Sequence, residues 1–136
     1  MDNCIFCKIT NGDIPSAKVY EDKNVYAFLD ISQVTKGHTL IIPKVHKENI
    51  FELEEEIAGP LFESVKKVAD AIQSAFSPKG LNLLNNNGET AGQTVFHYHM
   101  HLIPRYGFDD GFHPVFKENK GSHDLAGIAA AIQSHL

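Results

Sequence analysis

The chain has 136 residues, a length typical of one domain built around a single hydrophobic core. Apolar residues make up 43% and charged residues 21%, a mixture typical of globular rather than disordered chains. The formal net charge is -5 and the lysines are scattered singly or in one pair, which argues against a nucleic-acid binder, because such proteins carry a basic patch.

The N-terminal residues are polar and acidic, and no apolar run reaches the roughly 18 residues that a membrane span needs. We therefore expect no secretory signal, no membrane partner and a cytoplasmic location. Cys4 and Cys7 form a Cys-x-x-Cys pair. In a reducing cytosol such a pair is more often metal-binding or redox-active than a structural disulfide.

Short segments rich in β-branched and aromatic residues predict strands at Lys18–Glu21, Val25–Leu29 and 39–42. From 54 to 76, apolar residues recur every three or four positions, which predicts an amphipathic helix that ends before Ser77-Pro78. Gly59-Pro60 inside this pattern predicts either a kink or a late start of the helix.

Two more strands are expected at 81–85 and 96–103, with the polar, glycine-containing loop 86–94 between them. After Pro104 the chain is loop-like, and a short amphipathic helix is expected over 125–136. These elements predict an α+β domain with an antiparallel sheet of five strands, one long helix and a short C-terminal helix. No linker divides the chain, so we expect a single domain over 1–136.

Histidines alternate with apolar residues in His97-Tyr98-His99-Met100-His101. On an extended strand alternate side chains share a face, so the three imidazoles are expected on one side and Tyr98, Met100 and Leu102 in the core. A solvated sheet face or a metal clamp would be the plainer explanation. With a pKa near 6.5, a neutral imidazole could attack phosphorus while a protonated neighbour donates to the leaving group.

The loop 86–94 precedes these histidines directly. It offers backbone N–H groups at Gly88 and Gly92, the hydroxyl of Thr94 and the amide of Asn86. A glycine-containing loop alone is more often a plain turn, but next to the histidines it predicts a cradle for an oxyanion.

The segment 97–103 resembles the signature of the histidine triad (HIT) family, in which histidine and an apolar residue alternate three times. Segments 4–9, 28–31, 37–44 and 92–95 also resemble family segments, in the family's order. The similarity covers residues 4–106 and is greatest to bacterial Hint-type proteins. It implies the HIT-like fold and leaves 105–136 as a variable C-terminal segment, without the tryptophan-containing tail of eukaryotic Hint proteins.

The resemblance implies a nucleotidyl hydrolase or transferase that acts on the α-phosphate of purine nucleotide conjugates. Substrates would be nucleoside phosphoramidates or aminoacyl-adenylates, cleaved through a covalent nucleotidyl-histidine to release a nucleoside monophosphate, with no organic cofactor. It also implies a homodimer in which two five-stranded sheets join. An asymmetric dinucleoside polyphosphate hydrolase is the nearest alternative, and a zinc-dependent nucleotide-binding interaction module is an alternative of another class.

Carried over by position, His99 would be the nucleophile, oriented by a backbone carbonyl that we expect to be that of His97. His101 would assist the leaving group, and His97 completes the predicted catalytic set. Asp30 would bind the ribose hydroxyls, and Asn86, Gly92 and Thr94 the phosphate oxygens, with Thr94 standing where many Hint-type proteins have serine. The full nucleotide-binding set implied by the resemblance is Ile5, Phe6, Ile9, Phe28, Asp30, Ile31, His38, Asn86, Gly92, Gln93, Thr94, Val95, His99 and His101, with Ile5, Phe6, Ile9, Phe28 and Ile31 around the base.

A Cys-x-x-Cys pair commonly supplies half of a tetrahedral zinc site. A redox role would expect the pair at a strand-helix junction of a βαβ unit, which the N-terminal pattern does not offer. The resemblance implies His46 and His97 as the remaining ligands beside Cys4 and Cys7. Four protein ligands leave no position for water, so such a zinc ion would be structural, and two free thiols are the main alternative.

Overall fold

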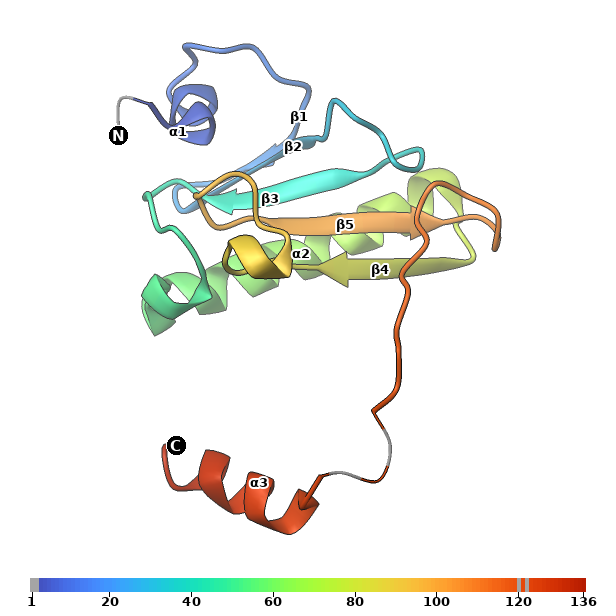
Figure 1. Ribbon diagram of the computed structural model, residues 1–136. Coiled ribbons are helices and arrows are strands. Elements are labelled where there is room, and N and C mark those ends of the chain that lie inside the picture. Colours follow the sequence, from blue (N-terminus) through green and yellow to red (C-terminus); the bar gives the residue numbers. More distant parts are fainter. Residues whose placement is uncertain (1–2, 120, 122) are drawn as a thin grey trace.

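An antiparallel sheet of five strands forms the centre of the protein (Figure 1), in a computed structural model that describes residues 3–136 except Lys120 and Ser122. The strand order is β1-β2-β3-β5-β4, which confirms the α+β prediction. The strands are β1 (Lys18–Glu21), β2 (Val25–Leu29), β3 (Thr39–Pro43), β4 (Gly80–Leu84) and β5 (Met100–Arg105). The first four agree with the sequence-based prediction to within one residue at each end.

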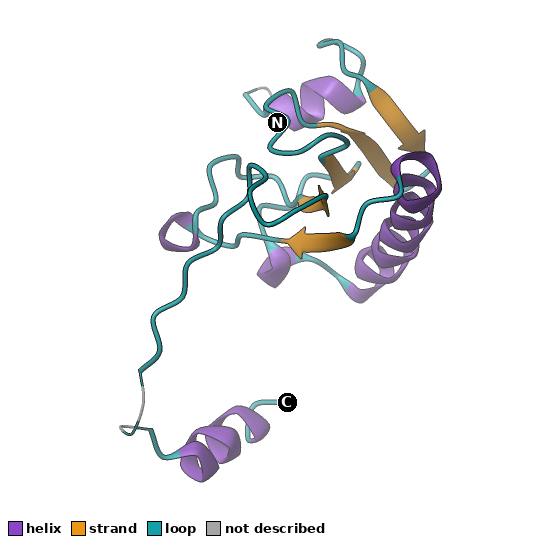
Figure 2. Ribbon diagram, turned by 90° about the vertical axis from the view of Figure 1, so that its right-hand side faces the viewer, coloured by secondary structure: helices purple, strands orange, loops and turns teal. Residues whose placement is uncertain are grey.

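Helix α2 (Glu55–Phe76) covers one face of the sheet (Figure 2). Its apolar stripe joins the main core, in which the buried side chains are Val25, Ala27, Ile41, Leu61, Val65, Val68, Ile72, Tyr98 and Leu102. The helix begins at Glu55, ahead of Pro60, so of the two expected alternatives, a kink or a late start, the late start is wrong. Two glutamates in the first turn interact favourably with the helix dipole. Burial of the apolar stripe offsets the free energy lost because Pro60 cannot donate a backbone hydrogen bond.

The opposite face of the sheet carries helix α1 (Ile5–Thr10), which the sequence did not predict. The Cys4 sulfur caps this helix by accepting a hydrogen bond from the Cys7 amide at 3.3 Å. Phe6 and Ile9 pack from α1 onto the sheet in a second buried cluster with Tyr26, Phe28, Leu40 and Ile42. The fold therefore has an apolar layer on each side of the sheet.

Strand β5 begins at Met100, so the prediction of a strand over 96–103 is wrong at its start. Its pairing with β3 begins at Met100, and the segment before it is held by other contacts, such as the hydrogen bond from the Tyr98 amide to the Lys47 carbonyl. The predicted alternation nevertheless extends ahead of the strand, because Tyr98 and Leu102 both lie in the core beneath α2.

Two 3-10 turns, η1 (Ile50–Glu52) and η2 (Glu89–Ala91), interrupt the long loops. The predicted C-terminal helix is present as α3 (Leu125–Gln133) and lies apart from the sheet at the end of an extended segment (Figure 1). Among the described residues, no helix combines the length and the apolar character needed to cross a membrane.

Replacing Ile41 by alanine tests the main core. Ile41 is fully buried between the sheet and α2, so we expect Ile41→Ala to lower the free energy of unfolding by about 2–5 kcal/mol. The matched control is Ile31→Ala, because the Ile31 side chain is 95% exposed and its loss should change stability by less than about 0.5 kcal/mol. Urea denaturation of the three proteins measures both values, and equal losses in the two variants would contradict this view of the core.

Candidate active site

The register of the sheet gathers a set of side chains on the face opposite α2. Phe28 of β2 lies beside Leu40 of β3, Leu40 lies beside His101 of β5, and His101 lies beside Leu84 of β4. Residues directly opposite one another in a ladder point to the same face. These four side chains therefore form a continuous floor across four strands.

A cavity of about 390 Å³ lies on this floor, within the size range of small-ligand sites. Helix α1, the loop 86–95 and Phe112 supply its walls. Predicted residues in its lining are Ile5, Phe6, Ile9, Phe28, Asp30, Ile31, His38, Asn86, Gly92, Thr94, Val95, His99 and His101. Five lining residues were missed: Val34, Leu40, Leu84, Ile103 and Phe112. Strand alternation could have found Leu40, Leu84 and Ile103, whereas no local pattern marks Phe112.

His99 stands in this cavity with one ring nitrogen already engaged. Its Nδ1 donates to the carbonyl oxygen of His97 at 2.8 Å, the arrangement that the family resemblance implies. The ring also packs edge-on against Phe6, with 5.1 Å between the centroids. Because Nδ1 carries the proton, Nε2 of the neutral ring keeps its lone pair and is free to meet a ligand.

His101 is oriented by a chain of hydrogen bonds. The Val34 amide donates to Nδ1 of His38 at 3.4 Å, so His38 carries its proton on Nε2. That nitrogen lies 2.9 Å from Nδ1 of His101, and 3.7 Å from a carboxylate oxygen of Asp30. Nδ1 of His101 is therefore the acceptor, and its Nε2–H remains as a donor for a ligand in the cavity.

Burial keeps these imidazoles neutral. Desolvation lowers the pKa of His97 and of His101 to about 4, and for His101 the neighbouring His99 and His38 add to the effect. Desolvation also lowers the pKa of His38 and of His99. The expectation that a neutral ring and an imidazolium coexist near pH 7 is therefore wrong for the protein without a ligand.

In the loop beside the histidines, the backbone amides of Gly88 and Gly92 donate hydrogen bonds to acceptors within the loop itself. Gly88 and Gly92 adopt positive φ angles of 91° and 97° on either side of η2, which favours glycine at both positions. The Gly88 amide donates to Oε1 of Gln93, and the Gly92 amide donates to the Glu89 carbonyl. The expected cradle of these two N–H groups is therefore wrong, and Asn86 and Thr94 supply the polar side chains of this wall.

The expected contact between the Gln93 side chain and the nucleotide is also corrected by the structure, because Gln93 is absent from the lining of the cavity. Its side chain is buried inside the loop, where Nε2 donates to the carbonyl oxygens of Glu48 and Val95 at 2.6 and 3.0 Å. A residue predicted to contact the nucleotide thus shapes the loop that carries Asn86 and Thr94. Its sequence position beside Thr94 could not reveal that its partners lie 45 residues away.

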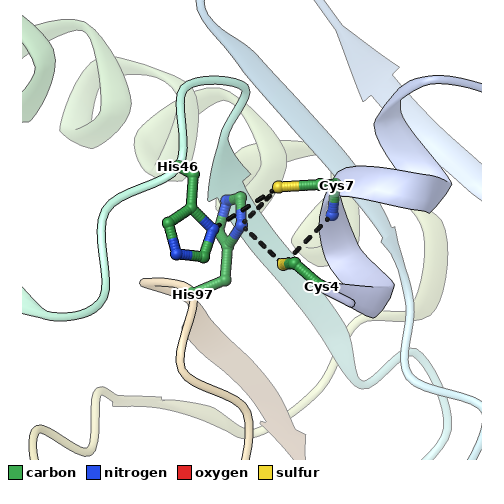
Figure 3. A group of neighbouring side chains, drawn as sticks. All are labelled: Cys4, Cys7, His46 and His97. Atoms are coloured by element: carbon green, nitrogen blue, oxygen red, sulfur yellow. Dashed lines mark hydrogen bonds between the residues drawn. The ribbon is translucent and has the colours of Figure 1, made fainter. Parts of the chain in front are cut away.

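Cys4, Cys7, His46 and His97 come together outside the cavity (Figure 3). Nδ1 of His97 lies 3.3 Å from the Cys4 sulfur and 3.5 Å from that of Cys7, and Nδ1 of His46 lies 3.4 Å from the Cys7 sulfur. A tetrahedral zinc ion with ordinary bond lengths separates its sulfur and nitrogen ligands by about 3.6 Å. Two thiols and two imidazoles at these distances fit such an ion.

The ring of His97 is committed to this cluster. Nε2 of His97 donates to the Pro43 carbonyl at 2.8 Å, which leaves the lone pair of Nδ1 facing the two sulfurs, as a metal ligand requires. Its predicted catalytic role is therefore confined to the backbone carbonyl that accepts from His99. Burial, followed by the contact with Cys4, raises the pKa of Cys7 to about 11, so a bound cation is needed to hold the thiolate.

Comparisons with known proteins agree on one family. The family model described as HIT domain matches residues 11–108. Protein hit of Bacillus subtilis is 61% identical over 138 residues, covering 99% of this chain and 95% of the relative. Adenosine 5'-monophosphoramidase hnt1 of Schizosaccharomyces pombe is 43% identical over 122 residues (85% and 89%), and adenylylsulfatase HINT3 of Arabidopsis thaliana is 40% identical over 104 residues (76% and 53%).

Solved structures give the same result. A HIT family protein from Bacillus anthracis superposes with a TM-score of 0.95 at 60% identity, covering 99% of this chain and 98% of the other. A Zn-bound histidine triad family protein from Mycobacterium smegmatis superposes with a TM-score of 0.76 at 32% identity, covering 99% of both chains.

The low pKa of His101 predicts a pH dependence of stability. The unfolded chain binds a proton at His101 below about pH 6.5, whereas the folded protein does so only near pH 4. Stability from this group is therefore fully present above pH 6.5 and is lost as the pH falls toward 4. We expect His101→Asn to lose less unfolding free energy than the wild type between pH 7 and pH 5, measured by urea denaturation with a chelator present. His113→Asn, at an exposed histidine, is the control and should follow the wild type, and identical curves for all three proteins would contradict the assignment.

Proposed function

Because this chain belongs to the HIT domain family, we propose that it hydrolyses purine nucleoside phosphoramidates and related adenylyl conjugates at the α-phosphate, releasing a nucleoside monophosphate. The observation that carries the proposal is the pairing of His99, with a free Nε2, and His101, with a free Nε2–H, in one apolar cavity. The names of two relatives, an adenosine 5'-monophosphoramidase and an adenylylsulfatase, support an adenylyl substrate.

The first step is attack of His99 Nε2 on the α-phosphorus. The phosphate brings negative charge beside His101, which raises its pKa and lets Nδ1 take up a proton from solvent as the substrate binds, while the Nε2–H of His38 turns from Nδ1 to the Asp30 carboxylate 3.7 Å away. As the new N–P bond forms, the bond from phosphorus to the leaving nitrogen breaks and His101 donates its proton to that nitrogen. The product of this step is a nucleotidyl-His99 and a free amine.

The second step is hydrolysis of the nucleotidyl-His99. Neutral His101 takes a proton from a water molecule that attacks the phosphorus, and the N–P bond to His99 breaks. The nucleoside monophosphate leaves, and Nε2 of His99 regains its lone pair. The hydrogen bond from Nδ1 to the His97 carbonyl keeps the ring in one orientation through both steps.

The remaining walls suit a nucleoside. Phe6 and Phe28, in edge contact at 5.5 Å, form an apolar slot for the base together with Ile5, Ile9 and Ile31. The Asp30 carboxylate would accept hydrogen bonds from the ribose hydroxyls. Asn86 and Thr94 would donate to the phosphate oxygens.

We also propose that zinc occupies the Cys4, Cys7, His46 and His97 cluster as a structural ion. The donor set and its spacing support zinc, as does the Zn-bound family member from Mycobacterium smegmatis. The ion would tie α1 to the segments that carry His46 and His97. Because the two thiols must be reduced to bind it, we place the protein in the cytoplasm.

A homodimer is the third part of the proposal. β4 is an edge strand of the sheet, and on it Leu83 is 45% exposed. An unpaired edge with an exposed apolar side chain is suited to pairing with a second copy, which would join two five-stranded sheets.

Removing the nucleophile tests the chemistry. We expect His99→Asn to lower the turnover of adenosine 5'-phosphoramidate by more than about 10⁴-fold, beyond the loss typical of an acid-base group. His101→Asn should lose about 10²–10⁴-fold, because attack on phosphorus remains possible without the proton donor. Rapid quench followed by mass spectrometry should find one adenylyl group on His99 of the wild type.

His113→Asn is the control for both variants and should turn over normally, since His113 is exposed. Near-normal rates in His99→Asn would remove His99 from its role. Faster cleavage of diadenosine tetraphosphate than of the phosphoramidate would favour the polyphosphate hydrolase. Nucleotide binding without turnover of either compound would favour the interaction module.

Removing one thiol tests the zinc proposal. We expect Cys4→Ser to lose bound zinc, measured by elemental analysis, and to lower the melting temperature by more than about 4 °C, the shift that 1 kcal/mol produces in a domain of this size. Cys4→His keeps a ligand and should restore most of the metal. Turnover should fall less than stability, because the cluster lies outside the cavity. A metal-free wild type with the same melting temperature as Cys4→Ser would refute the site.

A further inference from the structure

Three consecutive asparagines follow β4, and their side chains divide into two groups. Asn86 lines the cavity, whereas Asn85 and Asn87 are absent from its lining. These two are bonded to each other, because Nδ2 of Asn87 donates to Oδ1 of Asn85 at 2.6 Å. Neither is an exposed residue. Alternate side chains of an extended segment share a face, so Asn85 and Asn87 form a pair on the side of the chain away from the cavity.

One end of this pair reaches the backbone of His99. Nδ2 of Asn85 donates to the carbonyl oxygen of His99 at 2.9 Å. The last paired residues of β4 and β5 at this end of the sheet are Leu84 and His101, so His99 lies beyond the ladder. The Asn85 side chain therefore continues the contact between the two segments past the end of the ladder, at the residue that carries the proposed nucleophile.

The other end of the pair reaches the first residue of η1. The Ile50 backbone amide donates to Oδ1 of Asn87 at 2.7 Å. The segment that leads into η1 is itself bonded next to the nucleophile, because the Lys47 carbonyl accepts from the Tyr98 amide at 2.6 Å. Residues 47–50 are thus tied both to the residue before His99 and, through the two asparagines, to His99 itself.

The direction of every hydrogen bond in this chain is fixed by its two ends. The Ile50 N–H can only donate, and the His99 carbonyl can only accept. Oδ1 of Asn87 must therefore face Ile50, which leaves Nδ2 of Asn87 as the donor to Oδ1 of Asn85. Turning either side-chain amide around would set two donors or two acceptors against each other. Asn85 is consequently held in the orientation in which it donates to His99.

We propose that Asn85 is a positioning residue for His99 and that Asn87 keeps Asn85 in its working orientation. The ring of His99 is held at Nδ1 by the His97 carbonyl, and its backbone is held by Asn85. Attack requires the reacting atoms at about 3–3.5 Å, and a misplacement of about 1 Å costs on the order of 100-fold in rate. This inference rests on the proposed function, since it takes His99 as the nucleophile.

The first test removes the donor. Asn85→Leu keeps a side chain of similar size, and we expect the rate of adenylylation of His99 by adenosine 5'-phosphoramidate to fall about 10- to 100-fold in rapid-quench experiments. The dissociation constant of adenosine monophosphate should change by less than about twofold, because Asn85 does not line the cavity. The amplitude should stay at one adenylyl group per chain. The control, Asn119→Leu at an exposed asparagine, should keep the wild-type rate.

The second test asks whether the two asparagines act as one chain. Asn87→Leu leaves the Asn85 amide free to turn and should slow adenylylation about three- to tenfold, the range expected for one hydrogen bond. The double variant should be no slower than Asn85→Leu alone, because Asn87 acts only through Asn85. Losses that multiply in the double variant would overturn the chain.

Asn85→Asp keeps the tests decisive if leucine disturbs the fold. It preserves the size and the acceptor for Asn87 but sets an oxygen against the His99 carbonyl, so it should be slowed at least as much as Asn85→Leu. An unchanged rate in these variants, or a reduced amplitude at an unchanged rate, would overturn the positioning role. His99→Asn in the same assay separates the two proposals. Normal turnover in His99→Asn contradicts the proposed function, whereas an inactive His99→Asn beside a normal Asn85→Asp contradicts only this inference.

Discussion

The hydrogen bond from Nδ1 of His99 to the carbonyl oxygen of His97 is the contact on which the proposed chemistry depends. It determines which nitrogen of the nucleophile keeps a lone pair. His97 is itself held at both ring nitrogens, by the Pro43 carbonyl and by the cysteine sulfurs. The two hydrogen bonds to backbone carbonyls are buried, so each is stronger than it would be in water, and the contact with Cys4 is partly buried. The orientation of the cavity histidine is therefore set by a cluster that lies outside the cavity.

Helix α1 joins the two sites. Cys4 and Cys7 face the cluster, whereas Phe6 and Ile9 face the cavity and the sheet. A helix of six residues cannot be stable alone, so its position depends on contacts at both of its sides. The proposed structural ion could therefore support the proposed nucleotide slot without contacting the nucleotide.

The proposed substrate is an anion, yet the residues that line the cavity include no lysine or arginine. The chain is acidic overall, and burial lowers the pKa of both His99 and His101, so neither ring is charged near pH 7 before a ligand arrives. In the proposed reaction, positive charge is produced by the substrate itself, whose phosphate would raise the pKa of the nearest ring. A dry cavity with neutral donors thus avoids the cost of keeping a buried charge in the empty protein.

Local patterns in the sequence predicted the strands, the long helix and the alternation that separates Tyr98 from the histidines, because each depends on residues that are neighbours along the chain. Only the tertiary structure showed that His97 turns to the cysteines while His99 and His101 enter the cavity. It also showed that the Gln93 side chain lies inside its loop and that burial lowers the pKa of His101. Alternation specifies which face of the strand a side chain is on. The partners that it contacts there, and the extent to which it is shielded from water, depend on segments far away in the sequence.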